Sequence, residues 1–465
     1  MSIVSDPISP KTRPAAPRAG AAPLHQDPSG REARAADVTA DATACLALRN
    51  LRGAFIVILV SFHGCLAYLG STTGPATAFD QPPFAWLAFP VVDSRRWYGF
   101  DFYCAWEDVH VMALMFFLSG LFVAPSLTRK GSWRFLRERA ARLGTPFLFS
   151  VLVLAPIAIY PAYRSLAADP SLGAYARAYA APPFLPNGPA WFLWVLLALS
   201  VGVAIAYRLR PDALARLARL ASGAKARPGR YILGLTLAGA CGYVPLALAF
   251  TPWGWFTQGP FSLQESRPLI DAIYFCAGIG VGAHGIGRGL LAPDGGLVRN
   301  WRLLAIGAPL ALALWMGLTS VTLFEPAFAP LPMRFASATS YALACACGVC
   351  LMLALAMRFG VVRSSLLDLL SKNALSIYVL HYVPLVWVQY ALLDAPLPAI
   401  VKALIVFWVT LSVALGAAVA MRRIRLGARL LGEDVDGGRA VGFAATQLMS
   451  LERAEDAKPR RSRHG

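Results

Sequence analysis

A basic residue and a histidine lie on one face of the first long apolar segment, residues 48–70. Arg52 and His63 are eleven positions apart. In an α-helix this spacing is about three turns, or roughly 16 Å of rise, so both side chains leave the helix on nearly the same side. This rise predicts Arg52 at a membrane surface and His63 near the middle of the bilayer. Because ionisable groups are costly at that depth, this pair is a candidate catalytic site.

Two further arginines follow the second apolar segment, in the stretch KGSWRFLRERAARLGTP. Arg139 and Arg142 are three residues apart, so on a helix both side chains can reach one anion. The planar guanidinium group suits phosphate, which it binds through two hydrogen bonds. The alternative is that these arginines only orient the chain in the membrane.

Polar residues also interrupt two other apolar segments. Glu107, Asp108 and His110 lie where the second segment begins, in WEDVHVMALMFFLSG. A carboxylate there can bind substrate hydroxyls or orient a base, although acids are also common at helix N-termini for purely structural reasons. His381, in SIYVLHYVPL, is about two and a half helical turns from Lys372 and again near the middle of the membrane.

The composition predicts an all-α polytopic membrane protein. The chain has 465 residues, of which 57% are hydrophobic and 15% are charged, with a mean hydropathy of +0.55. Soluble domains carry about 25% charged residues. Runs of 18 or more mostly apolar residues recur along the chain, as membrane-spanning helices require. We expect ten spans, at 48–70, 107–127, 143–162, 189–207, 232–250, 269–287, 302–322, 336–357, 373–392 and 399–421.

The net charge of +18 arises from arginines in short loops and in the tails. Alternate loops differ sharply, with 19 lysines and arginines in one set and 6 in the other. This asymmetry indicates membrane orientation rather than nucleic-acid binding, and it places the basic loops and both termini in the cytoplasm. The basic loops are 128–142, 208–230, 285–302 and 358–372.

Two further groups of residues have both a functional and a purely structural interpretation. The predicted outer loop 71–106 is rich in aromatic residues, which suit either an interfacial belt or a platform that stacks on sugars. Cys345, Cys347 and Cys350 lie in a run of small residues without a neighbouring histidine or carboxylate, so we expect close helix packing there and no metal site.

Five short patterns in order along the chain resemble the acyltransferase-3 family of integral membrane acyltransferases. The resemblance covers residues 46–422, which we expect to form the transmembrane acyltransferase domain. Residues 1–45, which lack an apolar signal-peptide core, are expected to form a disordered cytoplasmic tail, and 423–465 a basic cytoplasmic tail. The patterns are Arg52 with His63, Phe116 to Gly120, Arg139 with Arg142, Trp191 to Leu193, and Tyr378 with His381.

The resemblance implies transfer of an acyl group, acetyl or succinyl, from cytoplasmic acyl-CoA to a hydroxyl of an envelope carbohydrate or related acceptor. Acyl-CoA is then a substrate, and no permanently bound cofactor is expected. The stretch from His110 to Phe117 looks most like the branch that succinylates periplasmic glucans, although Val111 and Ala113 replace the usual arginine and proline.

The resemblance also assigns roles to individual residues. Its catalytic residues correspond to His63, as general base, and Arg52, which binds a CoA phosphate or stabilises the developing oxyanion. Arg139 and Arg142 are expected to bind the donor. The expected substrate-binding residues are Asp108, His110, Tyr378 and His381.

A transporter or flippase is the alternative from a different functional class. In that case His63, His110 and His381 would pass protons through the helix bundle. Turnover of acyl-CoA by the purified protein separates the two alternatives, since only an enzyme transfers or hydrolyses the thioester.

The charge asymmetry of the loops makes a topology prediction. In intact cells, single cysteines introduced into loop 71–106 should react with a membrane-impermeant thiol reagent, whereas those in loop 208–230 should be protected. The positive-inside rule gives this order. The reverse labelling pattern would contradict the predicted orientation, and with it the side from which the donor enters.

Overall fold

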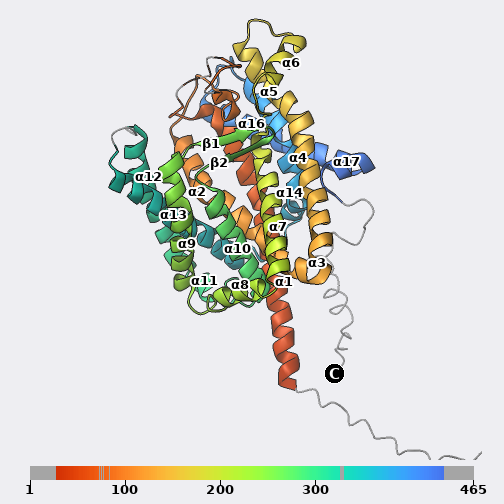
Figure 1. Ribbon diagram of the computed structural model, residues 1–465, viewed down its shortest axis with the longest axis vertical. Coiled ribbons are helices and arrows are strands. Elements are labelled where there is room, and N and C mark those ends of the chain that lie inside the picture. The colour runs from red at the N-terminus through yellow and green to blue at the C-terminus, as the bar shows by residue number, and fades with distance from the viewer. Residues whose placement is uncertain are drawn as a thin grey trace, which may run out of the picture.

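The computed structural model describes residues 28–72, 74, 76, 78–82, 84–324 and 329–433 and consists mainly of helices, which confirms the predicted all-α class (Figure 1). The helices are α1 (Pro28–Cys65), η1 (Leu66–Tyr68), η2 (Ala85–Leu87), α2 (Gly99–Gly120), α3 (Val123–Arg139), η3 (Ala140–Gly144), α4 (Thr145–Phe149), η4 (Ser150–Leu154), α5 (Ala155–Leu166), α6 (Leu172–Ala180), η5 (Gly188–Ala190), α7 (Trp191–Leu209), α8 (Ala213–Ser222), α9 (Pro228–Phe250), α10 (Pro268–His284), α11 (Gly296–Arg299), α12 (Trp301–Phe324), α13 (Leu331–Phe359), α14 (Ser365–Leu380), α15 (Tyr382–Ala391), α16 (Ala399–Arg422) and α17 (Arg425–Leu430). Two short strands, β1 (Trp255–Gln258) and β2 (Phe261–Gln264), form an antiparallel hairpin.

Seven helical segments of the described chain are long and apolar enough to cross a membrane, or eight if the bent pair α14–α15 is one span. The protein is therefore a multi-pass membrane protein, but the predicted count of ten spans is not confirmed. The span expected at 269–287 corresponds to α10, whose 17 residues fall short of the roughly 20 needed to cross a bilayer. The span expected at 107–127 overlaps α2, which carries the carboxylates of Asp101, Glu107 and Asp108.

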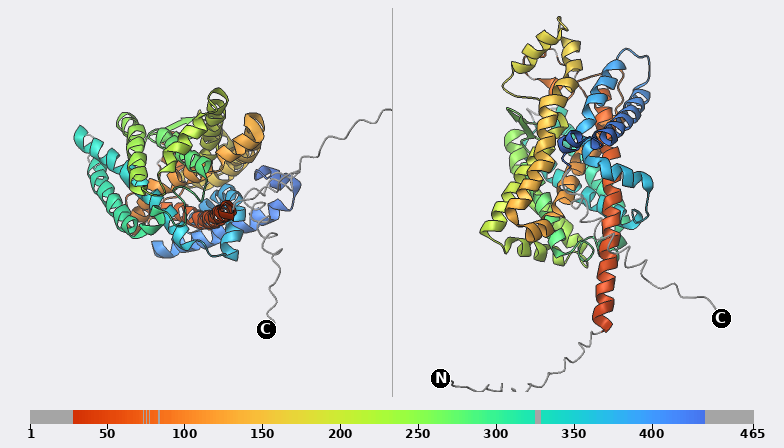
Figure 2. Two further views of the ribbon diagram at one scale, coloured as in Figure 1. Left: turned by 90° about the horizontal axis from the view of Figure 1, so that it is seen from below. Right: turned by 90° about the vertical axis from the view of Figure 1, so that its right-hand side faces the viewer.

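Helix α1 is longer than the first predicted span. It begins at Pro28, so it includes residues 28–45 of the predicted N-terminal tail, and its first part projects beyond the bundle (Figures 1 and 2). The rest of that tail, residues 1–27, lies outside the described residues. Of the predicted C-terminal tail, 423–465, the structure describes α17 and the residues as far as Glu433, and the prediction for 434–465 lies outside the described part.

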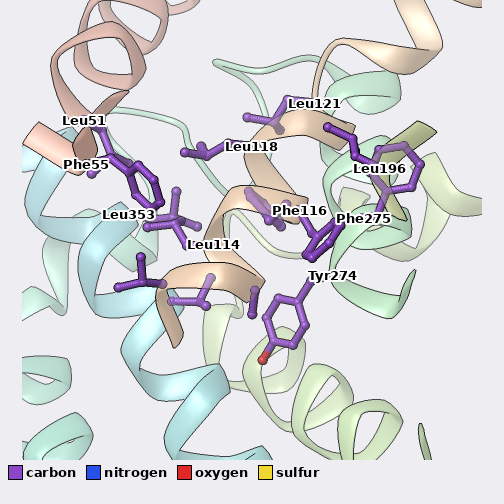
Figure 3. Packing of buried hydrophobic residues seen from close by; sticks show 14 of the residues in the cluster. Leu51, Phe55, Leu114, Phe116, Leu118, Leu121, Leu196, Tyr274, Phe275 and Leu353 are labelled. Carbon is purple, nitrogen blue, oxygen red and sulfur yellow. The ribbon is translucent and has the colours of Figure 1, made fainter. Parts of the chain in front are cut away.

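Small residues bring α2 and α10 into backbone contact at the centre of the bundle. A Cβ atom at Gly278 would lie 2.0 Å from the carbonyl oxygen of Phe117, and one at Gly282 would lie 1.9 Å from that of Leu121. The two glycines are four residues apart, a spacing that lets membrane helices pack closely. The large side chains of α2 then pack on both of its sides, with Leu114 and Leu118 toward α1 and α13, and Phe116 near Phe275 of α10 (Figure 3).

Helices α3, α4 and α5 form one long apolar segment interrupted by two π-helical turns. These turns are η3 (Ala140–Gly144) and η4 (Ser150–Leu154), and the whole segment from Val123 to Leu166 is a candidate span. A π-turn inserts one extra residue and rotates the side chains that follow it, and such turns are common at functional sites. Here η3 carries Arg142, and Arg139 ends α3 immediately before it.

A buried ion pair joins the segment after α1 to the start of α16. Lys402 Nζ lies 2.7 Å from Asp93 Oδ2, and both side chains are 0% exposed. The ammonium group also donates to the carbonyl of Leu393 at 3.1 Å, and the other carboxylate oxygen of Asp93, Oδ1, accepts from the backbone N–H of Arg95 at 2.7 Å. Because each charge has hydrogen-bonding partners, the pair can exist in the interior, but neither charge would be stable there alone.

This arrangement predicts unequal effects of single and double substitutions. Lys402→Met should destabilise the protein by about 3–5 kcal/mol, because it leaves the Asp93 carboxylate buried without its cation. The double variant with Asp93→Asn should recover most of that loss. Thermal unfolding of the detergent-purified protein, followed by tryptophan fluorescence, measures both. Lys130→Met, which removes the partly exposed partner of Glu138, is the control and should change stability by about 1 kcal/mol or less. Equal destabilisation by the single and double variants would contradict this prediction.

Candidate active site

Two histidines from opposite ends of the sequence meet inside the bundle. The rings of His63 and His381 lie edge to face, with centroids 5.0 Å apart. His63 is in the last turn of α1 and is half-buried, whereas His381 is fully buried at the break between α14 and α15. The chain bends by 62° at that break. The bend places the His381 ring beside the end of α1, so the structure brings these two predicted site residues together.

Backbone carbonyls fix the orientation of both imidazole rings. Nδ1 of His63 lies 2.9 Å from the carbonyl oxygen of Leu59, and Nδ1 of His381 lies 2.6 Å from that of Tyr378. A carbonyl only accepts hydrogen bonds, so each Nδ1 carries the proton and each neutral ring keeps a free lone pair on Nε2. In His381, Nε2 is buried and has no hydrogen-bond partner in the described part of the chain. The arrangement leaves Nε2 as the basic atom of each ring.

A small cavity lies beside Tyr378 and Tyr382, and neither His63 nor His381 is among its lining residues. It is lined by the two tyrosines that flank His381, Tyr378 and Tyr382, and by residues of η4 and of the turn before α7. The Tyr378 hydroxyl donates to the carbonyl of Pro189. The preceding Gly188 has a φ of +48°, and a Cβ there would lie 2.8 Å from the Tyr382 ring. Glycine is therefore required at this turn, since it permits both the backbone conformation and the close approach of the tyrosine.

Arg52 lies on the same continuous helix as His63, as the spacing predicted. Its Nη2 donates to the carbonyl of Ser371 in α14 at 3.1 Å. Helices α1 and α14 are very close here, because a Cβ at Gly53 would lie 2.6 Å from the carbonyl oxygen of Leu367. Arg52 is half-buried and is held against the N-terminal half of α14.

Arg142, one of the predicted arginine pair, lies within electrostatic range of Arg52. The positive charge of Arg142 acts on both Arg52 and Arg139, which places the three guanidinium groups in one region. Arg142 is exposed, whereas Arg139 is half-buried and packs against the ring of Phe135, with its Cζ 5.3 Å from the ring centroid. Three cations that repel one another form a strong binding site for an anion with several charges.

The structure places Asp108 in a contact that the sequence did not reveal. Nη1 of Arg267 donates to Asp108 Oδ1 at 2.9 Å and to the Asp108 carbonyl at 3.0 Å, and Nη2 binds Oδ2. The guanidinium also lies over the ring of Tyr341, 5.4 Å from its centroid. Both carboxylate oxygens of Asp108 are thus bound by Arg267, which joins α2 to the start of α10.

The ring of His110 packs against neighbours other than the histidine pair. Its ring packs against Trp106, with centroids 4.8 Å apart, and against the backbone at Gly348 of α13, where a Cβ would lie 2.7 Å from the ring. No interaction found among the described residues joins His110 to His63 or His381. The structure therefore does not bring this predicted site residue to the pair.

Three residues near the site were not among the sequence candidates. Tyr382 lies beside both histidine rings, with centroid distances of 6.4 Å to His63 and 6.2 Å to His381. Gln389 donates through Nε2 to the carbonyl of His63 at 3.1 Å and so joins α15 to α1. Arg422 contacts α14 at the end of α16. A lone amide or cation in or beside an apolar run was the available signal for Gln389 and Arg422.

Comparison with known proteins identifies the family of this fold and site. The model of the family described as "Acyltransferase domain" matches residues 46–420, which is most of the chain. No curated protein and no solved structure matches the sequence. The match covers both histidines of the pair, Arg52, and the two arginines at η3. The chain therefore belongs to the acyltransferase-3 family of integral membrane acyltransferases.

Proposed function

We propose that this acyltransferase moves an acetyl or succinyl group from cytoplasmic acyl-CoA to a hydroxyl of an envelope carbohydrate or related acceptor. Family membership supports the acyltransferase reaction. The observation that carries the proposal is the pair of half-buried His63 and fully buried His381, with a cluster of arginines beside the same helix that carries His63. A base and an anion site joined by one helix suit a long donor that is anionic at one end and reactive at the other.

His63 is the general base in this proposal. Its neutral Nε2 takes the proton of the acceptor hydroxyl while the oxygen attacks the thioester carbonyl carbon. The resulting tetrahedral oxyanion collapses, the carbon–sulfur bond breaks, and the proton moves from His63 to the departing CoA thiolate. An acyl-histidine intermediate is the alternative route, in which Nε2 itself attacks the carbonyl and the acceptor then takes the acyl group.

The arginine cluster is the proposed site for the phosphates of the donor. CoA carries a diphosphate and a 3′-phosphate, and guanidinium groups bind such oxygens through paired hydrogen bonds. Arg139 and Arg142 are suited to this role by their positions at η3. Arg52 extends the cluster toward α14 and lies on the side of α1 that leads to His63.

The two substrates are proposed to enter from opposite sides of the inner membrane. The excess of lysine and arginine in alternate loops supports cytoplasmic termini and a cytoplasmic route for the donor. The acceptor then approaches from the outer side, toward the cavity lined by Tyr378 and by Tyr382, whose ring lies near both histidine rings. Tyrosine hydroxyls and ring faces suit a hydroxylated acceptor.

The alternative proton-relay transporter receives less support. It requires His110 to exchange protons with His63 and His381, but the ring of His110 packs between Trp106 and Gly348. Family membership also favours the enzyme.

The proposed base makes a direct kinetic prediction. His63→Ala should lower kcat for acyl transfer by about 100-fold or more, because general-base catalysis typically contributes that much. The assay measures CoA thiol release and acyl transfer by the purified protein in nanodiscs, with an acceptor glycan present. Expression and membrane insertion should be normal, since removing a polar group does not oppose insertion.

His284→Ala is the control, because His284 ends α10 and packs beside Gly289, away from the pair. This variant should retain normal turnover. Near-normal turnover by His63→Ala together with loss of activity in His381→Ala would contradict our assignment and make His381 the base.

The arginine cluster makes a prediction about donor affinity. The double variant Arg139→Ala/Arg142→Ala should raise KM for acyl-CoA by about tenfold or more and change KM for the acceptor little, since only phosphate contacts are lost. The ratio of the donor KM of the double variant to that of the wild type should shrink at high salt, because screening weakens the ionic contacts that the wild type still makes. Arg134→Ala is the matched control, because Arg134 is on the same helix but pairs with Glu138. An unchanged donor KM in the double variant would leave both arginines as topology determinants only.

A further inference from the structure

The end of α16 holds a carboxylate from the chain itself. Nε of Arg422 lies 2.7 Å from one carboxylate oxygen of Glu433 and 2.9 Å from the other. The same guanidinium donates through Nη1 to Asn373 Oδ1 at 2.7 Å and to the carbonyl of Lys372 at 3.2 Å. Arg422 is therefore held in place by α14 while its Nε binds an anionic group. The side chains of Arg422 and Glu433 are each 28% exposed, so this contact is accessible to solutes.

The short helix α17 delivers Glu433 to this position. Leu431 is fully buried, and the backbone N–H of Glu433 donates to the carbonyl of Ala428 at 2.9 Å. Gly432 adopts a φ of +76°, and a Cβ there would lie 2.4 Å from the carbonyl oxygen of Arg142. The chain thus turns back against η3 through a glycine that no other residue can replace without strain. Figure 1 shows α17 beside α4, which it contacts.

Glu433 also acts on the proposed donor site. Its negative charge acts electrostatically on Arg142, and the positive charge of Arg142 acts on Arg52 and Arg139. The carbonyls that hold Arg52 and Arg422 belong to consecutive residues of α14, Ser371 and Lys372. The carboxylate of Glu433 therefore lies in a region with four guanidinium groups, those of Arg52, Arg139, Arg142 and Arg422. The excess of positive charge remains available for a more highly charged anion.

We propose that Arg142 and Arg422, with Asn373 orienting Arg422, form a phosphate-binding site that Glu433 occupies until acyl-CoA displaces it. The proposal rests on the proposed function, because it takes the donor phosphates as the ligand. A carboxylate carries one negative charge, and a phosphate monoester carries up to two with three acceptor oxygens, so the phosphate is the stronger ligand for two arginines. Tethered Glu433 is a competitor that keeps the arginines paired in the absence of donor.

The test measures binding of CoA and of 3′-dephospho-CoA to the full-length protein in nanodiscs by isothermal titration calorimetry. Glu433→Gln should tighten CoA binding several-fold, because the competitor loses its charge. Arg422→Ala should weaken CoA binding by about tenfold, as expected for a lost charged hydrogen bond. In the Arg422→Ala background, Glu433→Gln should increase the affinity for CoA less than it does in the wild type. A smaller effect of Arg422→Ala on 3′-dephospho-CoA would assign the 3′-phosphate to this site.

Glu138→Gln is the matched control, since it removes a carboxylate that pairs with Lys130 and Arg134 instead. It should leave CoA binding unchanged. A second measurement uses the wild-type protein alone. CoA should accelerate trypsin cleavage after Arg425 and Arg429, which are exposed on α17, because displacement of Glu433 loosens this segment.

The outcomes separate this proposal from the proposed function. Unchanged or weaker CoA binding by Glu433→Gln, with no effect of CoA on cleavage, would overturn the displacement of Glu433 even if acyl transfer is normal. CoA binding that responds to Glu433→Gln as expected, without any acyl transfer, would support the phosphate site and overturn the proposed function. Failure of the wild type to bind CoA would overturn both.

Discussion

Polar groups that are buried away from water must find partners within the protein, because apolar side chains and lipid supply none. Most of the residues described above follow from this constraint. Arg267 binds both oxygens of Asp108, and Lys402 binds Asp93. The chain bends by 62° at the break between α14 and α15, and there Nδ1 of the His381 ring lies against the carbonyl oxygen of Tyr378. Within the histidine pair, by contrast, the buried Nε2 of His381 has no hydrogen-bond partner among the described residues, and the proposed base is the neighbouring His63.

Helical periodicity was sufficient to predict the local arrangement of the site. The eleven-residue spacing places Arg52 and His63 along one side of an unbroken helix, and the three-residue spacing of Arg139 and Arg142 places both at η3. The family, too, could be recognised from short patterns. These signals are local, and a local signal requires only a known rise and rotation per residue.

The remaining features depend on contacts between distant parts of the chain. Asp108 and Arg267 are 159 residues apart, and Asp93 and Lys402 are 309 apart, so no spacing rule could pair them. The sequence showed a carboxylate at Asp108 but not the guanidinium that binds it, which is why a substrate role was expected there. The count of ten spans is not confirmed for a similar reason, since apolar content does not reveal that α10 ends after 17 residues.

The continuity of α1 has a consequence for the choice of donor. A single α-helix resists stretching, so the distance between the guanidinium cluster at Arg52 and the imidazole at His63 is set by the roughly 16 Å rise of eleven residues. The helix therefore fixes the distance between the two groups. Under the proposed function, a donor anchored by its anionic end reaches the base only if its flexible arm spans that length, so we expect shorter thioesters to bind without reacting. Selectivity for the donor then depends on backbone geometry as well as on the shape of any pocket.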